Sequence, residues 1–210
     1  MSITTHERPG VYSSYGASSL IRGSGGRKTV GLVAVNTKAT AKTVYTITSY
    51  EEAVTTFGSA GGQDMAELIR VILLNGAAAV AAVPIAASTD YEAGFAVLEG
   101  QENVSVVVCD STTQTDQQDL RDSVAAASAA RRERIAVVGG AASETVTNLI
   151  SRAAALNSER VVLVAPGGTD EDGTALSGLT AAAAVAGAIA AQSDPALPLS
   201  GAELTGLHGL

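Results

Sequence analysis

The sequence predicts an α/β protein: a mainly parallel open sheet with helices on its faces, preceded by an extended N-terminal arm. The first observation is that short continuous apolar runs alternate with segments of helical period from Lys28 onward, as in parallel sheets whose strands are buried on both faces. The second is composition: of 210 residues, 46% are hydrophobic and 16% are charged. That composition excludes a disordered chain and permits one sizeable core.

The first 26 residues differ from the rest of the chain. They are rich in Ser, Thr and Gly and show no sustained period, so we expect this arm to be disordered or to lie on a partner. Pro9 pushes Arg8 toward extended geometry, and three glycines just before the core provide a flexible joint. The sequence thus divides into three parts: residues 1–26, the extended arm; residues 27–195, an α/β core domain; and residues 196–210, a C-terminal segment.

Short apolar runs mark the strands. Five of them are expected to form the sheet: Val30–Val35, Ala79–Ile85, Val104–Cys109, Ile135–Val138 and Val161–Ala165. A further β-rich piece, Thr43–Thr48, precedes the first helix and is expected to pair at an edge of the sheet.

Capping patterns mark where two helices begin. Ser49 with Glu52, and Thr89 with Glu92, have the spacing of a capping box, in which the side chain of each residue accepts the free backbone N–H of the other. Glycines at positions 58 and 76 stand where a helix C-cap is expected.

Apolar periodicity predicts the other helices. Between Gln63 and Asn75 one apolar face should pack on the sheet; its residues are Met65, Leu68, Ile69, Ile72 and Leu73. Three further helices are expected, with these residues inward: Thr115–Arg132 (Leu120, Val124), Ser143–Leu156 (Val146, Leu149, Ile150, Ala153) and Leu176–Gln192.

Candidate sites for chemistry lie where strands end, because ligands of open α/β sheets bind beyond the carboxyl ends of the strands. Those places are Asp110–Ser111, Gly139–Gly140 and Pro166–Gly168. Asp110 and Ser111 follow a buried strand as a catalytic pair would, but both are also good turn formers before a helix.

Motifs of known chemistry are missing. The two histidines, His6 and His208, stand near the ends of the chain, and no Gly-x-Ser-x-Gly sequence occurs. One cysteine and two distant histidines give no zinc pattern, and the acidic turn Asp170–Gly173 lacks the distal Glu of a calcium loop. The glycine-rich stretches 23–26 and 58–62 are not followed by Gly-Lys-Ser/Thr. We therefore assign no catalytic, cofactor-binding or metal-binding residue and expect no cofactor.

Charge and hydropathy restrict the partners. A net charge of −8 argues against binding to nucleic acid or anionic lipid, although Arg131, Arg132 and Arg134 form one tight basic cluster. The segment Ala181–Ala191 is very apolar but shorter than the ~20 residues of a membrane span, so we expect a buried or subunit-facing helix and no membrane insertion. Cys109 is expected to be a buried thiol in a reducing compartment. No signal peptide is recognised in Met1–Gly26.

Several stretches, taken in order, resemble the tail sheath proteins of contractile phages. Glu7–Tyr12, "ERPGVY", resembles the Arg-Pro-Gly-Val-Tyr start of many sheath proteins, and Thr46–Gly58 resembles their strand and short helix ending in Phe-Gly. Val162–Gly168 with Leu176–Ala190 resembles the strand, loop and Ala-rich helix in the middle of the family. Pro198–Leu210 resembles the segment that follows, so this chain ends where the family's C-terminal domain would begin.

The resemblance implies a structural, non-enzymatic subunit. Such subunits polymerise helically around a tail tube and contract to drive it through the cell envelope. The implied partners are other sheath subunits, the tail tube, the baseplate and the tail terminator. The implied location is the virion tail, with assembly in the host cytoplasm. The arm would join subunits by adding a strand to a neighbour's sheet, through these residues: Arg8, Pro9, Gly10, Val11 and Tyr12.

Two alternatives remain open from the residues. One is a small-molecule-binding or hydrolytic α/β domain that uses Asp110 and its neighbours. The other is a sheath-like tail accessory or a fragment that does not polymerise.

Overall fold

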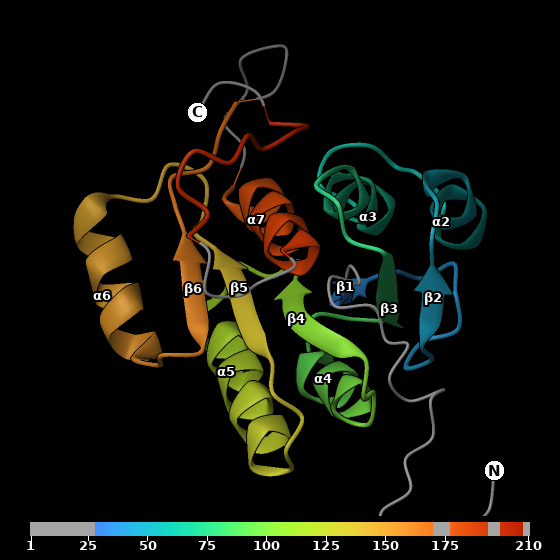
Figure 1. Ribbon diagram of the computed structural model, residues 1–210, viewed down its shortest axis with the longest axis horizontal. Coiled ribbons are helices and arrows are strands. Elements are labelled where there is room, and N and C mark those ends of the chain that lie inside the picture. The colour runs from blue at the N-terminus through green and yellow to red at the C-terminus, as the bar shows by residue number, and fades with distance from the viewer. Residues whose placement is uncertain (1–27, 170–176, 193–197, 208–210) are drawn as a thin grey trace, which may run out of the picture.

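The structure is a computed structural model that describes residues 28–169, 177–192 and 198–207. Those residues contain one six-stranded sheet in the order β2-β3-β1-β4-β5-β6 (Figure 1). Its strands are β1 (Thr29–Val35), β2 (Tyr45–Ile47), β3 (Ala79–Ile85), β4 (Val104–Cys109), β5 (Ile135–Gly139) and β6 (Val161–Val164). All five apolar runs are strands, which confirms the α/β fold class.

Strand β1 lies at the centre of the sheet. It pairs in parallel with β3 on one side and with β4 on the other, and β4, β5 and β6 continue the parallel pairing. The predicted edge piece is β2, which pairs antiparallel with β3. The core strands are buried on both faces, which explains their continuous apolar sequences.

Helices cover both faces of the sheet (Figure 1). Their bounds are α2 (Tyr50–Phe57), α3 (Met65–Leu74), α4 (Tyr91–Glu99), α5 (Gln114–Ala129), α6 (Val146–Leu156) and α7 (Leu179–Ala191). One core cluster joins one face of the sheet to α2, α3 and α7, and a second joins the other face to α4, α5 and the end of α6. The sheet is therefore the middle layer of three.

Helix α7 is buried, as its Ala-rich sequence predicts. Ala182, Ala183, Ala184 and Ala186 are fully buried, and a Cβ on Gly187 would lie 2.4 Å from the carbonyl oxygen of Ile72 in α3. Small side chains let the two helices approach closely over the sheet. In the described residues no helix is long and apolar enough to cross a membrane.

One of the two predicted capping boxes is wrong. Ser49 caps α2 as expected, because its hydroxyl accepts the Glu52 N–H. Helix α4, however, begins at Tyr91 after Asp90, whose side chain makes no capping bond. Asp90 is instead paired with Lys42, at 3.3 Å, and the Tyr91 ring is buried in the core. Tertiary contacts, not the Thr89 hydroxyl, determine where α4 starts.

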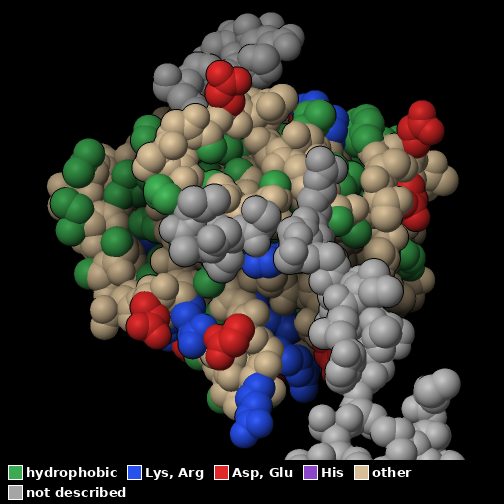
Figure 2. All heavy atoms as spheres, viewed as in Figure 1, with side chains coloured by type: hydrophobic (Ala, Val, Ile, Leu, Met, Phe, Trp, Pro, Cys, Tyr) green, Lys and Arg blue, Asp and Glu red, His purple; other side chains and the backbone are tan. Residues whose placement is uncertain are grey.

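The predicted inward face of α6 is wrong for three of its four residues; the fourth, Leu149, is partly buried and packs toward Gly140. Val146 is 72% exposed and Ile150 65% exposed, Ala153 is exposed, and the buried residues of α6 are Arg152 and Leu156. Figure 2 shows the apolar side chains at the surface over α6, at the left of the view. In this orientation Arg152 pairs under the helix with Glu144 at 3.0 Å, and a buried guanidinium is costly unless its charge or its N–H groups have partners.

Candidate functional site

The place where a ligand would bind in this fold is the carboxyl end of β1 and β4. The chain leaves β1 for β3 on one side and later returns to β4 on the other, and ligands of open α/β sheets bind in the crevice at such a reversal of strand order. The predicted pair Asp110–Ser111 follows β4 directly.

The Asp110 carboxylate closes this crevice. It accepts the Val35 N–H from the end of β1 at 2.9 Å and the Tyr91 hydroxyl from the start of α4. Burial raises the pKa of Asp110, while the hydrogen bonds from Tyr91 and Val35 oppose that shift. Burial and the neighbouring carboxylate also raise the pKa of Tyr91, so the phenol stays protonated and donates. Asp110 thus ties β1, β4 and α4 together, which is a structural role.

Ser111 makes its hydrogen bonds with the start of α5. It is buried, its hydroxyl donates to Asp116 in the first turn of that helix, and it accepts the Thr113 N–H at 3.1 Å. Both histidines, His6 and His208, lie outside the described residues. Within the described ones, Ser111 has no histidine beside it to act as a base, and its contacts are those of a residue that orders a helix N-terminus.

The Gly139–Gly140 turn is filled by the protein's own backbone. A Cβ on Gly139 would lie 2.4 Å from the carbonyl carbon of Gly178, which precedes α7. Gly140 donates its N–H to Val164 at 3.0 Å and accepts the Gly178 N–H at 2.8 Å. Glycine is needed here for chain packing, because the backbone that precedes α7 lies directly against the turn.

A buried polar network joins these places, and the sequence did not predict it. Arg152 pairs with Glu144 and also donates to the Thr112 carbonyl at 2.7 Å and to the Gln117 side chain at 3.1 Å. The Gln117 amide in turn donates to the carbonyls of Ser111 and Gly139. The signal that could have revealed it is a single arginine on a helix with no other charged residue.

The charge state of Glu144 follows from this network. Burial opposes its ionisation, but hydrogen bonds from Arg152 and the Ala141 N–H, with the Arg152 charge, outweigh burial and lower the pKa of Glu144. All the partners in this network belong to the chain itself, so it holds the ends of β4 and β5 against α5 and α6.

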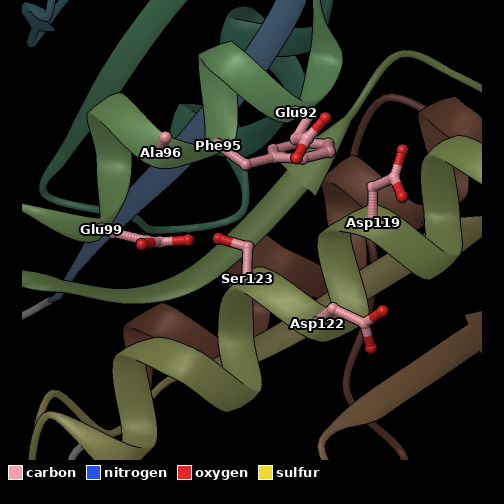
Figure 3. A pocket seen from close by; sticks show the side chains of 7 residues that line it. All are labelled: Glu92, Phe95, Ala96, Glu99, Asp119, Asp122 and Ser123. Carbon is pink, nitrogen blue, oxygen red and sulfur yellow. The ribbon is translucent and has the colours of Figure 1, made fainter.

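An acidic hollow lies between α4 and α5 (Figure 3). Its volume is about 300 Å³, and its lining includes Glu92, Glu99, Asp119 and Asp122 beside Phe95. Burial and then the nearby carboxylates raise the pKa of Asp119. Among the described residues, no group of three or more carboxylate, histidine or cysteine side chains is arranged to hold a metal ion. The hollow is an acidic groove on the surface.

Several predicted positions lie outside the described residues: Arg8–Tyr12 of the arm and the acidic turn Asp170–Gly173. Cys109 lies within them and is fully buried. This confirms the expected buried thiol, and burial raises its pKa to about 12.

Comparisons with known proteins agree on one family. A family model described as the phage tail sheath protein central domain matches residues 85–210. No curated protein matches the sequence.

Three similar solved structures are sheath proteins. The helical sheath of the anti-feeding prophage in its contracted state has 16% identity and a TM-score of 0.55 over 88% of this chain and 53% of that one. A sheath tail protein from Desulfitobacterium hafniense has 13% identity and a TM-score of 0.61, and the match covers 87% of this chain and 62% of that protein. A sheath tail protein from Listeria innocua has 13% identity and a TM-score of 0.56, and the match covers 79% of this chain and 57% of that protein. The chain thus spans about half to three fifths of these proteins, and at such identities the similarity concerns the fold.

Proposed function

Because this chain belongs to the phage tail sheath family, whose central-domain model matches residues 85–210, we propose that it is a structural subunit of a contractile tail sheath, of a phage or a phage-like injection device. The proposal rests on one observation: the chain that matches the sheath family model also has the fold of solved sheath proteins. One similar structure is a helical sheath in its contracted state and another belongs to the anti-feeding prophage baseplate.

The subunit acts without catalysis in this proposal. Support comes from the crevice at the ends of β1 and β4, where Asp110 is held by Tyr91 and Val35 and the glycine turn is filled by Gly178. A hydrolytic or nucleotide-binding domain would need that space. A thermal-shift screen with nucleotides tests this: an enzyme or binding protein is stabilised by its ligand, whereas we expect no shift.

The proposed partners are other copies of the subunit, the tail tube, the baseplate and the tail terminator. The proposed location is the virion tail, after assembly in the host cytoplasm. Within the assembly the arm, through Arg8–Tyr12, adds a strand to the sheet of a neighbouring subunit. Its composition supports this role, because a segment without an apolar period cannot bury itself alone.

Electron microscopy of the purified chain tests assembly. We expect rings or tubes in negative stain, and a variant that lacks residues 1–26 should form neither while keeping the circular dichroism spectrum of the intact chain. Unimpaired assembly after this deletion would refute the role of the arm. A clean monomer in every condition would instead favour the second candidate, a sheath-like accessory or fragment that does not polymerise.

A further inference from the structure

A basic hollow lies at the amino ends of the parallel strands, opposite the closed crevice. It has a volume of about 250 Å³, and its lining includes Lys28, Ser105, Arg134 and Arg160. These residues stand just before β1, at the start of β4, before β5 and before β6. Parallel pairing therefore brings together four residues that are far apart in the sequence. Figure 2 shows several Lys and Arg side chains on the lower part of the face in view, with Asp and Glu side chains among them.

Arg134 brings to the basic hollow a buried charge that has no ion pair among the described residues. It is 3% exposed, and its guanidinium donates to the carbonyls of Leu98 at 2.9 Å and Gln101 at 2.6 Å at the end of α4. Burial, and then the charge of Arg132, lowers the pKa of Arg134. Its Nε atom and the Ser105 hydroxyl are buried without a hydrogen-bond partner among the described residues. Such groups normally have partners.

The carboxylate that lines the hollow is already used. Glu133 pairs with Arg160 at 2.5 Å and accepts the Ser128 hydroxyl. Lys28 makes no ion pair with any residue that the structure describes. The hollow thus carries three cationic side chains against one carboxylate, and the chemistry that complements it is a cluster of carboxylates.

The densest acidic segment of the chain lies between β6 and α7 in the sequence. Asp170, Glu171 and Asp172 are consecutive. They are bounded by described residues that follow the carboxyl end of β6 and precede α7, whereas Arg160 stands at the amino end of β6. The arm does not complement the basic hollow, because residues 1–27 contain three arginines and one glutamate.

We propose that the basic hollow binds the acidic segment Asp170–Asp172 of a second copy of this chain. The inference rests on the proposed sheath function and names a contact between its subunits. A contact between two different parts of the chain in two copies is heterologous, so its repetition produces a ring or a helical filament. Complementary charges also give such a contact its orientation and its sensitivity to salt.

A labelled peptide of residues 167–177 tests the contact directly. By fluorescence anisotropy the intact protein should bind this peptide, and binding should weaken as salt rises from about 0.05 to 0.5 M because exposed charges are screened. A peptide with Asn or Gln in place of the three acids should not bind. Equal binding of both peptides, or of neither, would overturn the proposal.

Charge reversal supplies the matched control. Arg160→Glu should weaken peptide binding by about tenfold or more. Lys42→Glu makes the same change in net charge and also breaks one exposed ion pair, but it lies far from the hollow and should leave binding unchanged. Circular dichroism checks that both variants fold, and equal effects of the two would contradict a specific site.

Exchanging the acidic and basic charges of the proposed contact tests this inference independently of the proposed function. Asp170→Arg with Asp172→Arg should reduce self-association measured by analytical ultracentrifugation, and adding Arg160→Glu and Lys28→Glu to the same chain should restore it. If the intact chain assembles and these variants assemble equally well, the inference fails and the sheath function stands. If the intact chain never self-associates, both fail.

Discussion

Asp110 has a feature of a catalytic acid, but its contacts are structural. Its pKa is raised by burial, as in a catalytic acid, yet its oxygens are occupied by Tyr91 and the Val35 N–H. Because the folded-state pKa of Asp110 lies above the unfolded value, its contribution to stability is fully present below the unfolded pKa and declines as pH rises through the folded pKa. The phenol limits that decline by bonding the charged form.

Replacement of Tyr91 by Phe tests this role. Tyr91→Phe leaves the carboxylate with one donor fewer, so the free energy of unfolding at pH 7 should fall by about 1–3 kcal/mol. The loss should shrink as pH is lowered through the pKa of Asp110, because the neutral acid depends less on that donor. Urea denaturation at several pH values measures both. A cost independent of pH would mean that only packing was lost.

Gly139 is the residue for which backbone packing is most demanding. Gly139→Ala would place a methyl group 2.4 Å from the Gly178 backbone and should cost about 3 kcal/mol. Gly100→Ala is the control, since its Cβ would meet its nearest neighbour at 3.7 Å, and its effect should stay within about 1 kcal/mol. Denaturant midpoints compare the two. Similar values would show that the turn relaxes freely.

At the scale of elements, α6 shows how a buried polar residue overrides an apolar pattern. The sequence places Val146, Ile150 and Ala153 on one face, but Arg152 must reach Glu144 and Gln117. Removing the partner of a buried guanidinium costs about 3–5 kcal/mol, which is comparable with the burial energy forgone when two apolar side chains stay exposed. The helix turns its apolar face outward, where it is free for contact with another molecule.

Two substitutions in α6 make this orientation testable. Ile150→Ser changes a residue that is 65% exposed and should alter the free energy of unfolding by no more than about 0.5 kcal/mol. Leu156→Ala removes a side chain that is 3% exposed and should cost about 2–5 kcal/mol. Thermal or urea unfolding ranks them, and the reverse ranking would restore the inward face expected from periodicity.

At the scale of the molecule, one continuous sheet contributes side chains to both core clusters. Strand β1 contributes Leu32 to the cluster under α3 and α7 and Val33 to the cluster under α4. The two layers share every central strand and so should unfold together. Self-association, in contrast, is proposed to depend on the arm and on a contact between the basic hollow of one copy and the segment Asp170–Asp172 of another.

Removal of residues 1–26 separates stability from assembly. At a protein concentration too low for assembly, the shortened chain should unfold in one transition with a free energy within about 1 kcal/mol of the intact chain, because the described core begins at Lys28. Urea denaturation followed by circular dichroism checks this. A much less stable shortened chain would show that the arm belongs to the subunit's own core.

The sequence by itself determined the α/β class, the five parallel strands, the edge strand, the helix capped by Ser49 and the buried Ala-rich helix, because apolar runs and caps are local patterns. It also contained the resemblance to sheath proteins. Only the tertiary structure decided the strand order, the start of α4, the outward face of α6 and the closure of the crevice by Asp110. Each of these depends on the pairing of groups far apart in the chain, such as Tyr91 with Asp110 and Val35 with Asp110. No local pattern encodes such pairs, because their energies arise only when folding brings both partners out of water.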